Sequence, residues 1–304
     1  MVAVMPLADN MTQQTSSKIS GTSKWPVRVA VIGVGLLGGS VAKAIRRRLP
    51  EVQLVAWARS HQKKEELSKE GTFDEVFDDI QEVAADCDVA VVASPVTHIA
   101  KLVSEIGRHS PPDCLVTDVG STKLSIVESI EKDSHVRSRF VAAHPIAGSE
   151  KTGIEHAQSD LFDQKWIILT PGSHVAPKWL EKARSFWSLT GGIVQEMSPK
   201  AHDTHLAAIS HVPHLVSSLV AKIAPAEART LAGSGWRDIT RVAAGDPGMW
   251  TAICQENRGA ISAELNRVRQ ELEQLQRILD TGDDAKLQAW LTEAQNIKKH
   301  QTTS

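Results

Sequence analysis

The glycine-rich segment near the N-terminus constrains the fold more than any other feature. The pattern Gly33-x-Gly35-x-x-Gly38 follows an apolar, strand-like run at 27–32 and precedes a helix-like segment at 41–49. Three glycines at this spacing between a strand and a helix are typical of dinucleotide-binding folds. Gly33 permits a tight turn, Gly35 lets the backbone approach a pyrophosphate, and Gly38 lets helix and strand pack closely. The segment therefore predicts a dinucleotide-binding unit at the start of the chain.

Strand-like and helix-like segments alternate beyond this unit. Further strands are expected at 52–57, near 76, and at 89–93, 114–118, 140–143, 166–170 and 192–196. Such alternation is typical of the α/β class and of a doubly wound, mostly parallel sheet. We therefore expect an N-terminal Rossmann-like domain.

From Ser198 onward the sequence favours helices alone and predicts an all-helical C-terminal domain. The segment 199–223 is apolar on most faces, so a second subunit must cover part of it, and we expect a homodimer. An apolar stripe near the C-terminus is expected to form a bundle core and comprises Leu265, Val268, Leu272, Leu275 and Ile278. The expected organisation is a disordered tail at 1–25, a dinucleotide-binding domain at 26–197 and a helical substrate and dimerisation domain at 198–304.

The composition argues against several functional classes. The 34 Lys and Arg residues nearly balance the 36 Asp and Glu residues, so we expect no nucleic-acid partner. Three cysteines without metal-ligand spacing predict reduced thiols in a cytoplasmic protein. We expect no membrane span, because the apolar region 206–224 carries two histidines, a proline and a lysine. The chain has no tyrosine, which excludes dehydrogenase mechanisms that use a tyrosine phenol as general acid.

The end of the second predicted strand indicates which nicotinamide cofactor is bound. Folds that choose NAD usually place Asp or Glu there, whereas this chain places Arg59 and Ser60. An arginine can bind a 2′-phosphate, so the sequence favours NADP over NAD. In the alternative interpretation, Arg59 is a surface residue that opens the next helix. Further cofactor contacts are expected from Leu36, Leu37, Ser94, Pro95 and Asp118.

His144 is the leading candidate for chemistry. It follows the strand-like run 140–143, and Pro145 and Gly148 then break regular structure. Open α/β sheets bind ligands at such strand ends, although a histidine there can also simply pack. His211 and His214 lie three residues apart on one predicted helix, a spacing that could hold a metal. No third ligand has a suitable spacing, so we expect substrate hydrogen bonding there and no metal.

Six short blocks of glycine and polar residues follow one another in a set order. They are Gly33-x-Gly35-x-x-Gly38, Asp118-Val-Gly120-Ser121-x-Lys123, His144-Pro145-x-x-Gly148-x-Glu150, Ser210-His211-x-Pro213-His214, Arg237-Asp238-x-Thr240-Arg241 and Asp246-Pro247-x-x-Trp250. In order and spacing, over roughly residues 27–295, this set resembles the prephenate/arogenate dehydrogenase family of tyrosine biosynthesis. The resemblance implies oxidative decarboxylation of prephenate to 4-hydroxyphenylpyruvate, of arogenate to tyrosine, or of both, with hydride transfer to NAD(P).

The resemblance also implies roles for individual residues. His144 would accept the proton of the ring hydroxyl, and Ser121 would share that hydroxyl and orient the imidazole. Arg241 would clamp the substrate carboxylate. The remaining expected substrate contacts are His211 and His214, with Ser210 supporting them, Asp203 and Trp250 shaping the cleft, and Glu150 holding the loop after His144.

Two other functions remain open from the sequence. One is a β-hydroxyacid or 6-phosphogluconate-type dehydrogenase, although Lys200 and Lys222 do not sit in the lysine motif of such enzymes. The other is a non-catalytic NADP-sensing protein, which would need neither His144 nor Arg241. Within the favoured function the sequence does not choose between prephenate and arogenate, and His214 favours prephenate slightly.

Overall fold

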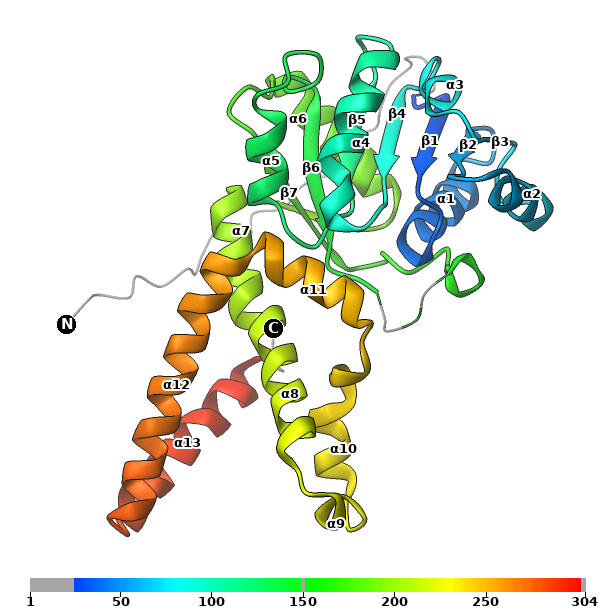
Figure 1. Ribbon diagram of the computed structural model, residues 1–304. Helices are drawn as coiled ribbons and strands as arrows, with labels where there is room; N and C mark the ends of the chain where they lie inside the picture. Colours follow the sequence, from blue (N-terminus) through cyan, green and yellow to red (C-terminus); the bar gives the residue numbers. More distant parts are fainter. Residues whose placement is uncertain (1–24, 149–150, 152, 302–304) are drawn as a thin grey trace.

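A computed structural model of the chain describes residues 25–148, 151 and 153–301. The expected tail, 1–25, lies almost entirely outside the described residues. Two parts are evident in Figure 1: a sheet domain flanked by helices, and a helical domain that extends away from one end of the sheet. The sheet ends at Glu196 and the helical domain begins at Pro199.

The sheet has eight strands and confirms the predicted fold class. Its order is β3-β2-β1-β4-β5-β6-β7-β8, and the first six strands are parallel. β7 runs antiparallel to β6, and β8 is parallel to β7. The order of the first six strands is that of dinucleotide-binding folds. The strands are β1 (Arg28–Ile32), β2 (Gln53–Trp57), β3 (Glu75–Phe77), β4 (Val89–Val92), β5 (Leu115–Asp118), β6 (Phe140–Pro145), β7 (Trp166–Pro171) and β8 (Ile193–Glu196).

Helices cover both faces of the sheet, which explains why its central strands are apolar throughout. Along β1, Val29 and Val31 enter one hydrophobic core, while Ala30 and Ile32 enter the other. The first core includes α1 (Leu36–Arg48) and α6 (Pro177–Leu189), and the second includes α3 (Ile80–Ala84), α4 (Val96–His109) and α5 (Leu124–Ile130). α2 (His61–Glu70) packs at the β3 edge, and a short 3-10 turn, η1 (Ile154–His156), packs on α1.

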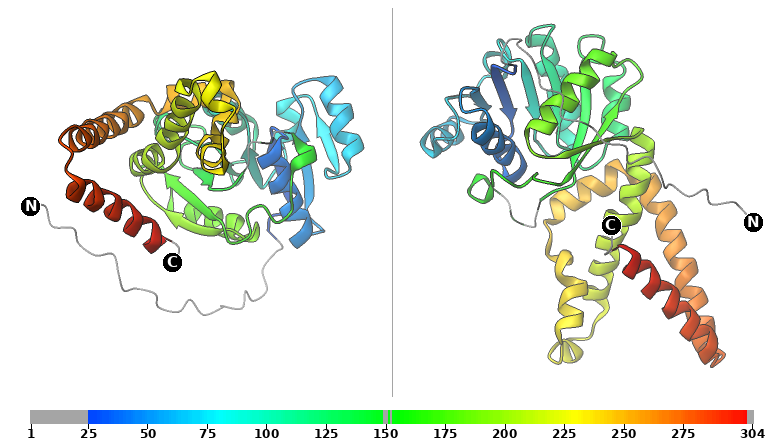
Figure 2. Two further views of the ribbon diagram at one scale, coloured as in Figure 1. Left: turned by 90° about the horizontal axis from the view of Figure 1, so that it is seen from below. Right: turned by 180° about the vertical axis from the view of Figure 1, so that it is seen from behind.

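The helical domain starts with three segments along one axis, α7 (Pro199–Leu206), η2 (Ala207–His211) and α8 (Val212–Ile223). The chain then returns beside α8 through α9 (Ala226–Arg229), α10 (Ser234–Thr240) and η3 (Arg241–Ala244). α11 (Pro247–Glu256) contacts α4, which ties the two domains together. α12 (Arg258–Asp280) and α13 (Asp284–Gln301) form a hairpin that diverges from α8 and α10 in every view (Figures 1 and 2).

Two expectations about the helical domain need correction. The predicted regular helix at 199–223 contains a π-helical turn, η2, at Ala207–His211, a feature that often accompanies functional sites. The segment Pro199–Ile223 is also long and apolar enough to cross a membrane, by length and composition alone. Such evidence is weak, because helices within protein cores meet the same criterion.

The apolar stripe of α12 is not a closed bundle core within one chain. Ile278 is buried, but Leu265 and Leu272 are 39% and 55% exposed. Ile209, Leu219 and Ile223 on η2 and α8 are exposed as well. Exposed apolar surface of this extent is typical of a subunit interface.

Candidate active site

His144 lies at the carboxyl end of β6, at the edge of the sheet that faces the helical domain (Figure 1). It pairs with Ile168 of β7 and is therefore inside the strand rather than just after it. Parallel pairing between β5 and β6 stops at Val141. Beyond that point two side chains hold Ala143, since its N–H donates to Asp118 Oδ1 at 3.0 Å and its carbonyl accepts from Lys123 Nζ at 2.8 Å. The backbone that carries His144 is thus fixed from the protein interior.

Asp118 and Lys123 form an ion pair and are both fully buried. Burial lowers the pKa of Lys123, and the Asp118 carboxylate opposes that shift. Asp118 also accepts from the N–H of Gly120 at 2.8 Å. Its oxygens therefore bind groups of the protein itself, which gives Asp118 a structural role, and its expected contact with the cofactor stays a prediction.

The imidazole of His144 is held by a second histidine. His144 Nδ1 lies 2.8 Å from His202 Nε2, and His202 Nδ1 lies 2.7 Å from Asp203 Oδ1. His202 is fully buried and Asp203 nearly so. His202 is therefore the hydrogen-bonding partner of His144, and Asp203 faces His202 and the protein interior. The roles expected of Ser121 and Asp203 toward a substrate stay predictions.

The environment keeps His144 neutral near pH 7. Burial lowers its pKa well below the usual value of 6.5, and the nearby groups His202, Lys123 and His211 lower it further. A neutral imidazole can accept a proton, whereas an imidazolium cannot. The site thus provides a base in its active form.

Three further aromatic rings, those of His211, His214 and Trp250, pack together in the helical domain. The ring of His214 stacks on Trp250 of α11 at a centroid distance of 3.5 Å, and His211 meets the same indole edge-on at 6.2 Å. His211 and His214 are buried, and both rings contact the same side chain, Trp250. Asn257 Nδ2 lies 3.2 Å from His211 Nδ1 and donates to the carbonyl of Asp203 at 2.7 Å.

These histidines are also neutral, and they border a cavity. Burial lowers the pKa of His214 and lowers that of His211 to about 4. A cavity of about 630 Å³ is lined by His214, Trp250 and Arg258, among others. The Nδ1 atom of His214 is buried and has no hydrogen-bond partner within the described residues.

Arg241 and Ser210 are less enclosed. Arg241 is exposed on η3, which packs against α8, and its guanidinium forms no hydrogen bond or ion pair with another described residue. Ser210 is half-buried on η2, and Ser121 is half-buried after β5. The expected contacts of Arg241, Ser210 and Ser121 with the substrate therefore stay predictions. Glu150, the expected support of the loop after His144, lies outside the described residues.

The glycine fingerprint has the geometry that a dinucleotide requires. Gly33 has a φ of +100°, and a Cβ there would overlap the carbonyl of Ala93. A Cβ at Gly38 would overlap the backbone of Gly33, whereas one at Gly35 would meet no protein atom. The N-terminus of α1 has no side-chain cap and no acidic residue in its first turn. Open space at Gly35 beside free N–H groups fits a pyrophosphate.

The other expected cofactor contacts surround this turn. Leu36 and Leu37 open α1, and Ser94 and Pro95 connect β4 to α4. Arg59 is exposed at the end of β2. The hydroxyl of Ser60 accepts from the N–H of Lys63 at 3.3 Å and so caps α2.

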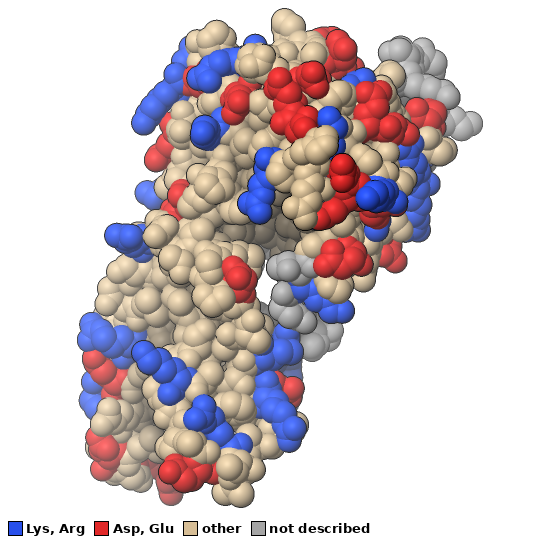
Figure 3. All heavy atoms as spheres, turned by 45° about the vertical axis from the view of Figure 1, so that its right-hand side comes forward, with Lys and Arg blue, Asp and Glu red and all other residues tan. Residues whose placement is uncertain are grey.

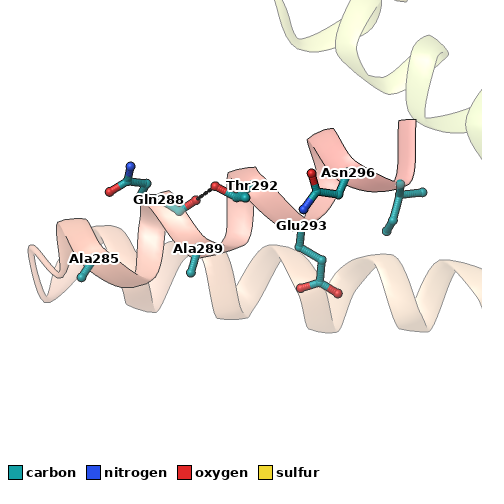
Figure 4. Close-up of a pocket in the computed structure, with 7 residues that line it drawn as sticks. Ala285, Gln288, Ala289, Thr292, Glu293 and Asn296 are labelled. Atoms are coloured by element: carbon teal, nitrogen blue, oxygen red, sulfur yellow. Dashed lines mark hydrogen bonds between the residues drawn. The ribbon is translucent and has the colours of Figure 1, made fainter. Parts of the chain in front are cut away.

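Other features of the surface do not suggest a competing site. A hollow of about 860 Å³ lies along α13, distant in sequence from every candidate residue, and most of its lining comes from uncharged side chains such as Gln288 and Thr292 (Figure 4). Charges of both signs are mixed over the face drawn in Figure 3, and the region where the domains meet is largely uncharged. No group of three or more His, Cys, Asp or Glu side chains in the described part of the chain could hold a metal ion.

Comparisons with known proteins agree with the geometry. The family described as "Prephenate dehydrogenase, nucleotide-binding domain" matches residues 41–196, and "Prephenate dehydrogenase, dimerization domain" matches residues 198–293. The prephenate dehydrogenase of Bacillus subtilis is 30% identical over 277 residues, which cover 89% of this chain and 75% of that protein.

Solved structures are similar over most of the chain. The prephenate dehydrogenase of Aquifex aeolicus, in complex with hydroxyphenyl propionate and NAD+, has a TM-score of 0.85 and 29% identity, covering 92% of this chain and 99% of that one. The arogenate dehydrogenase of Synechocystis has a TM-score of 0.77 and 28% identity, covering 90% and 99%.

Proposed function

Since the chain belongs to the prephenate dehydrogenase family, we propose that it oxidatively decarboxylates prephenate, arogenate or both with a nicotinamide cofactor. One observation carries most of this proposal. His144, a neutral and oriented base, lies at the carboxyl edge of the same sheet whose first turn carries the glycine fingerprint. A base and a hydride acceptor at one sheet edge are what oxidation of an alcohol requires.

His144 accounts for the proton in this reaction. The substrate is a cyclohexadienol, whose ring carbon loses a hydride while its hydroxyl proton passes to the imidazole and a carbonyl forms. Loss of the ring carboxylate as carbon dioxide then returns an electron pair to the ring, which becomes aromatic. The resulting phenolate takes the proton back from His144, so the imidazole ends the cycle neutral. Ser121, one strand away on the sheet, would donate a hydrogen bond to the same oxygen.

Arg241 would hold a substrate carboxylate. A guanidinium presents paired donors that match a carboxylate, and Arg241 has no competing partner within the described residues. Its position on η3, beside the α8 helix that bears His214, supports this role. Aromatisation drives the decarboxylation, so the carboxylate needs an anchor rather than a dedicated acid.

The cavity beside His214 favours prephenate over arogenate. The two substrates differ in a keto acid and an amino acid side chain, and an ammonium group favours a nearby carboxylate. The cavity is lined by Arg258 and, among the described residues, by no Asp or Glu. A keto acid fits this charge better than an ammonium does.

The cofactor would lie across the fingerprint, with its pyrophosphate over Gly35 and the N-terminus of α1. When bound, the nicotinamide supplies the hydride acceptor. We propose NADP as the preferred form because Arg59 is an exposed cation at the end of β2, where no acid is present to bind a ribose hydroxyl.

We also propose that the protein is a cytoplasmic homodimer. The exposed apolar residues of α8 and α12 support association through the helical domain. Cys87, Cys114 and Cys254 are free, as expected of a reducing compartment, although Cys87 and Cys114 are neighbours in the core at 3.4 Å between sulfur atoms.

A four-way assay tests the proposed function. Purified protein is supplied with prephenate or arogenate and with NAD or NADP, and reduced cofactor, carbon dioxide and aromatic product are measured together. We expect equal amounts of all three with at least one pair, and the highest rate with prephenate and NADP. Absence of cofactor reduction in all four mixtures would overturn the proposal.

A further inference from the structure

Three hydrogen-bonded side chains, Asp203, His202 and His144, form a row that begins in the protein interior. Asp203 Oδ1 lies 2.7 Å from His202 Nδ1, and His202 Nε2 lies 2.8 Å from His144 Nδ1. His202 and Asp203 come from the first helix of the helical domain, whereas His144 comes from the sheet. The hydrogen bond between His202 and His144 therefore crosses the boundary between the two domains.

We propose that His202, held by Asp203, is a positioning residue that fixes His144 in the tautomer with its proton on Nδ1, so that Nε2 is free to accept the substrate proton. This inference rests on the proposed function, in which His144 is the base. The role of His202 follows from its two hydrogen-bonding partners. It does not follow from the burial of His202 or from its position in the sequence before the block Ser210–His214.

The carboxylate of Asp203 sets the direction of both hydrogen bonds in this row, the one to His202 and the one between His202 and His144. Its Oδ1 accepts from the N–H of Lys123 at 2.8 Å, and its Oδ2 accepts from the N–H of Leu124 at 2.9 Å. These two groups belong to the N-terminus of α5, so the carboxylate is held firmly and faces only donors. A carboxylate that accepts from His202 Nδ1 requires the proton to be on that nitrogen.

The remaining positions follow from the chemistry of a neutral imidazole. With a proton on Nδ1, His202 has a lone pair on Nε2, which can only accept. His144 must then donate from Nδ1, which leaves the lone pair of its ring on Nε2, at the opposite edge. A histidine without such a partner would divide between two tautomers, and one of them could not act as a base from Nε2.

The charges around the pair are consistent with two neutral rings. His144 faces His202 of α7, Lys123 of the β5–α5 connection and His211 of η2, all of which oppose a second proton on its ring. His202 faces Asp203, Lys123 and Asp118, and burial outweighs the carboxylates and lowers its pKa. When His144 takes up the substrate proton, Asp203 can stabilise the new cation through His202, as a buried aspartate does for the histidine of a serine protease.

A merely structural role for His202 makes a different prediction. The two rings also meet edge-on, with centroids 5.0 Å apart, so His202 could act only by filling space. Phenylalanine retains the ring but cannot accept a hydrogen bond. Glutamine loses the ring, but its side-chain oxygen can accept from His144 Nδ1. Positioning predicts that Gln rescues activity better than Phe, whereas space filling predicts the reverse.

The test compares His202→Phe, His202→Gln and a control, His205→Phe, at an exposed position of the same helix. We expect His202→Phe to lower kcat on the order of 10²-fold or more while the KM for substrate changes little. His202→Gln should retain most of kcat, and His205→Phe should match the wild type. A kcat that is unchanged in His202→Phe, or lower in His202→Gln than in His202→Phe, would overturn the inference.

A second readout does not depend on turnover. Nitrogen NMR of histidine-labelled protein reports which ring nitrogen carries the proton, and His144→Asn identifies the His144 signal among the 12 histidines. We expect a single Nδ1-protonated tautomer in the wild type and a mixture in His202→Phe. A mixture already present in the wild type would contradict the inference, even if the enzyme is active. A single tautomer in an inactive protein would instead count only against the proposed function.

Discussion

Asp118 and Lys123 form a fully buried ion pair at the carboxyl edge of the sheet, next to the strand that bears His144. Together they satisfy the N–H and the carbonyl of Ala143, the residue before His144. A buried ion pair seldom adds stability over apolar residues of the same volume. Here the pair supplies hydrogen bonds to the β6 backbone beyond the point where pairing between β5 and β6 ends. It thereby fixes the position of the strand residue that precedes His144.

Loss of one partner of this pair should be costly. Lys123→Met retains the length of the side chain but leaves the Asp118 carboxylate buried without its cation, so we expect a loss of about 3–5 kcal/mol in the free energy of unfolding. Urea denaturation measures this loss. Lys132→Met, at an exposed position after α5, should change stability by less than about 0.5 kcal/mol. A similar small change in Lys123→Met would show that the pair is dispensable.

The fingerprint glycines should separate into two kinds. A methyl group at Gly35 meets no protein atom, so Gly35→Ala should unfold like the wild type but bind cofactor more weakly. A methyl group at Gly38 overlaps the backbone of Gly33, so Gly38→Ala should lower the denaturation midpoint. The dissociation constant of the cofactor is measured by adding cofactor to the protein and monitoring tryptophan fluorescence. Unchanged affinity in a folded Gly35→Ala protein would contradict the proposed position of the pyrophosphate.

Arg59 should determine the choice of nicotinamide. Arg59→Asp replaces a partner for the 2′-phosphate with an acid that repels it and can bind a ribose hydroxyl. We expect the ratio of kcat/KM with NADP to that with NAD to fall by at least about tenfold. Arg229→Asp, exposed on α9, should leave the ratio unchanged. If Arg59→Asp also leaves it unchanged, Arg59 is only a surface residue.

The buried histidines should make stability depend on pH. A histidine in the unfolded chain has a pKa of about 6.5. In the folded protein, burial lowers the pKa of His211 to about 4. Below pH 6.5 the unfolded state binds more protons, so the free energy of unfolding falls as the pH falls toward 4. His211 alone accounts for about 3 kcal/mol of this loss.

Urea denaturation between about pH 7.5 and about pH 4.5 measures this dependence. His211→Asn should reduce the slope, and His205→Asn, at an exposed position, should not. An equal slope in all three proteins would mean that His211 is not held neutral by the fold.

The sheet domain could be predicted closely because its signals are local. The strands expected at 166–170 and 192–196, after His144, are β7 and β8. Central strands are continuous apolar runs between glycine-rich turns, so their positions follow from short stretches of sequence. The glycine fingerprint needed only its neighbours to be interpreted.

The orientation of His144 could not be predicted, because it depends on contacts across 58 residues. His202 and Asp203 are adjacent polar residues in a helix, which is ordinary for a solvent-facing position. The packing of α7 against α5, β7 and α12 buries them and brings them to β6. In the same way, the stripe of α12 has the pattern of a bundle core, yet its partner is absent from the single chain, since sequence periodicity does not indicate whether a helix packs within a chain or between chains.

The most direct test of the account is the kinetics of His144→Asn with prephenate and NADP, set beside Arg241→Gln. Arg241→Gln should mainly raise the KM for substrate, since it removes a carboxylate clamp. His144→Asn should lower kcat by about 10³-fold, because the base is lost, while the dissociation constant of the cofactor stays unchanged. A His144→Asn enzyme whose kcat is within about tenfold of the wild type would show that His144 is not the proton acceptor.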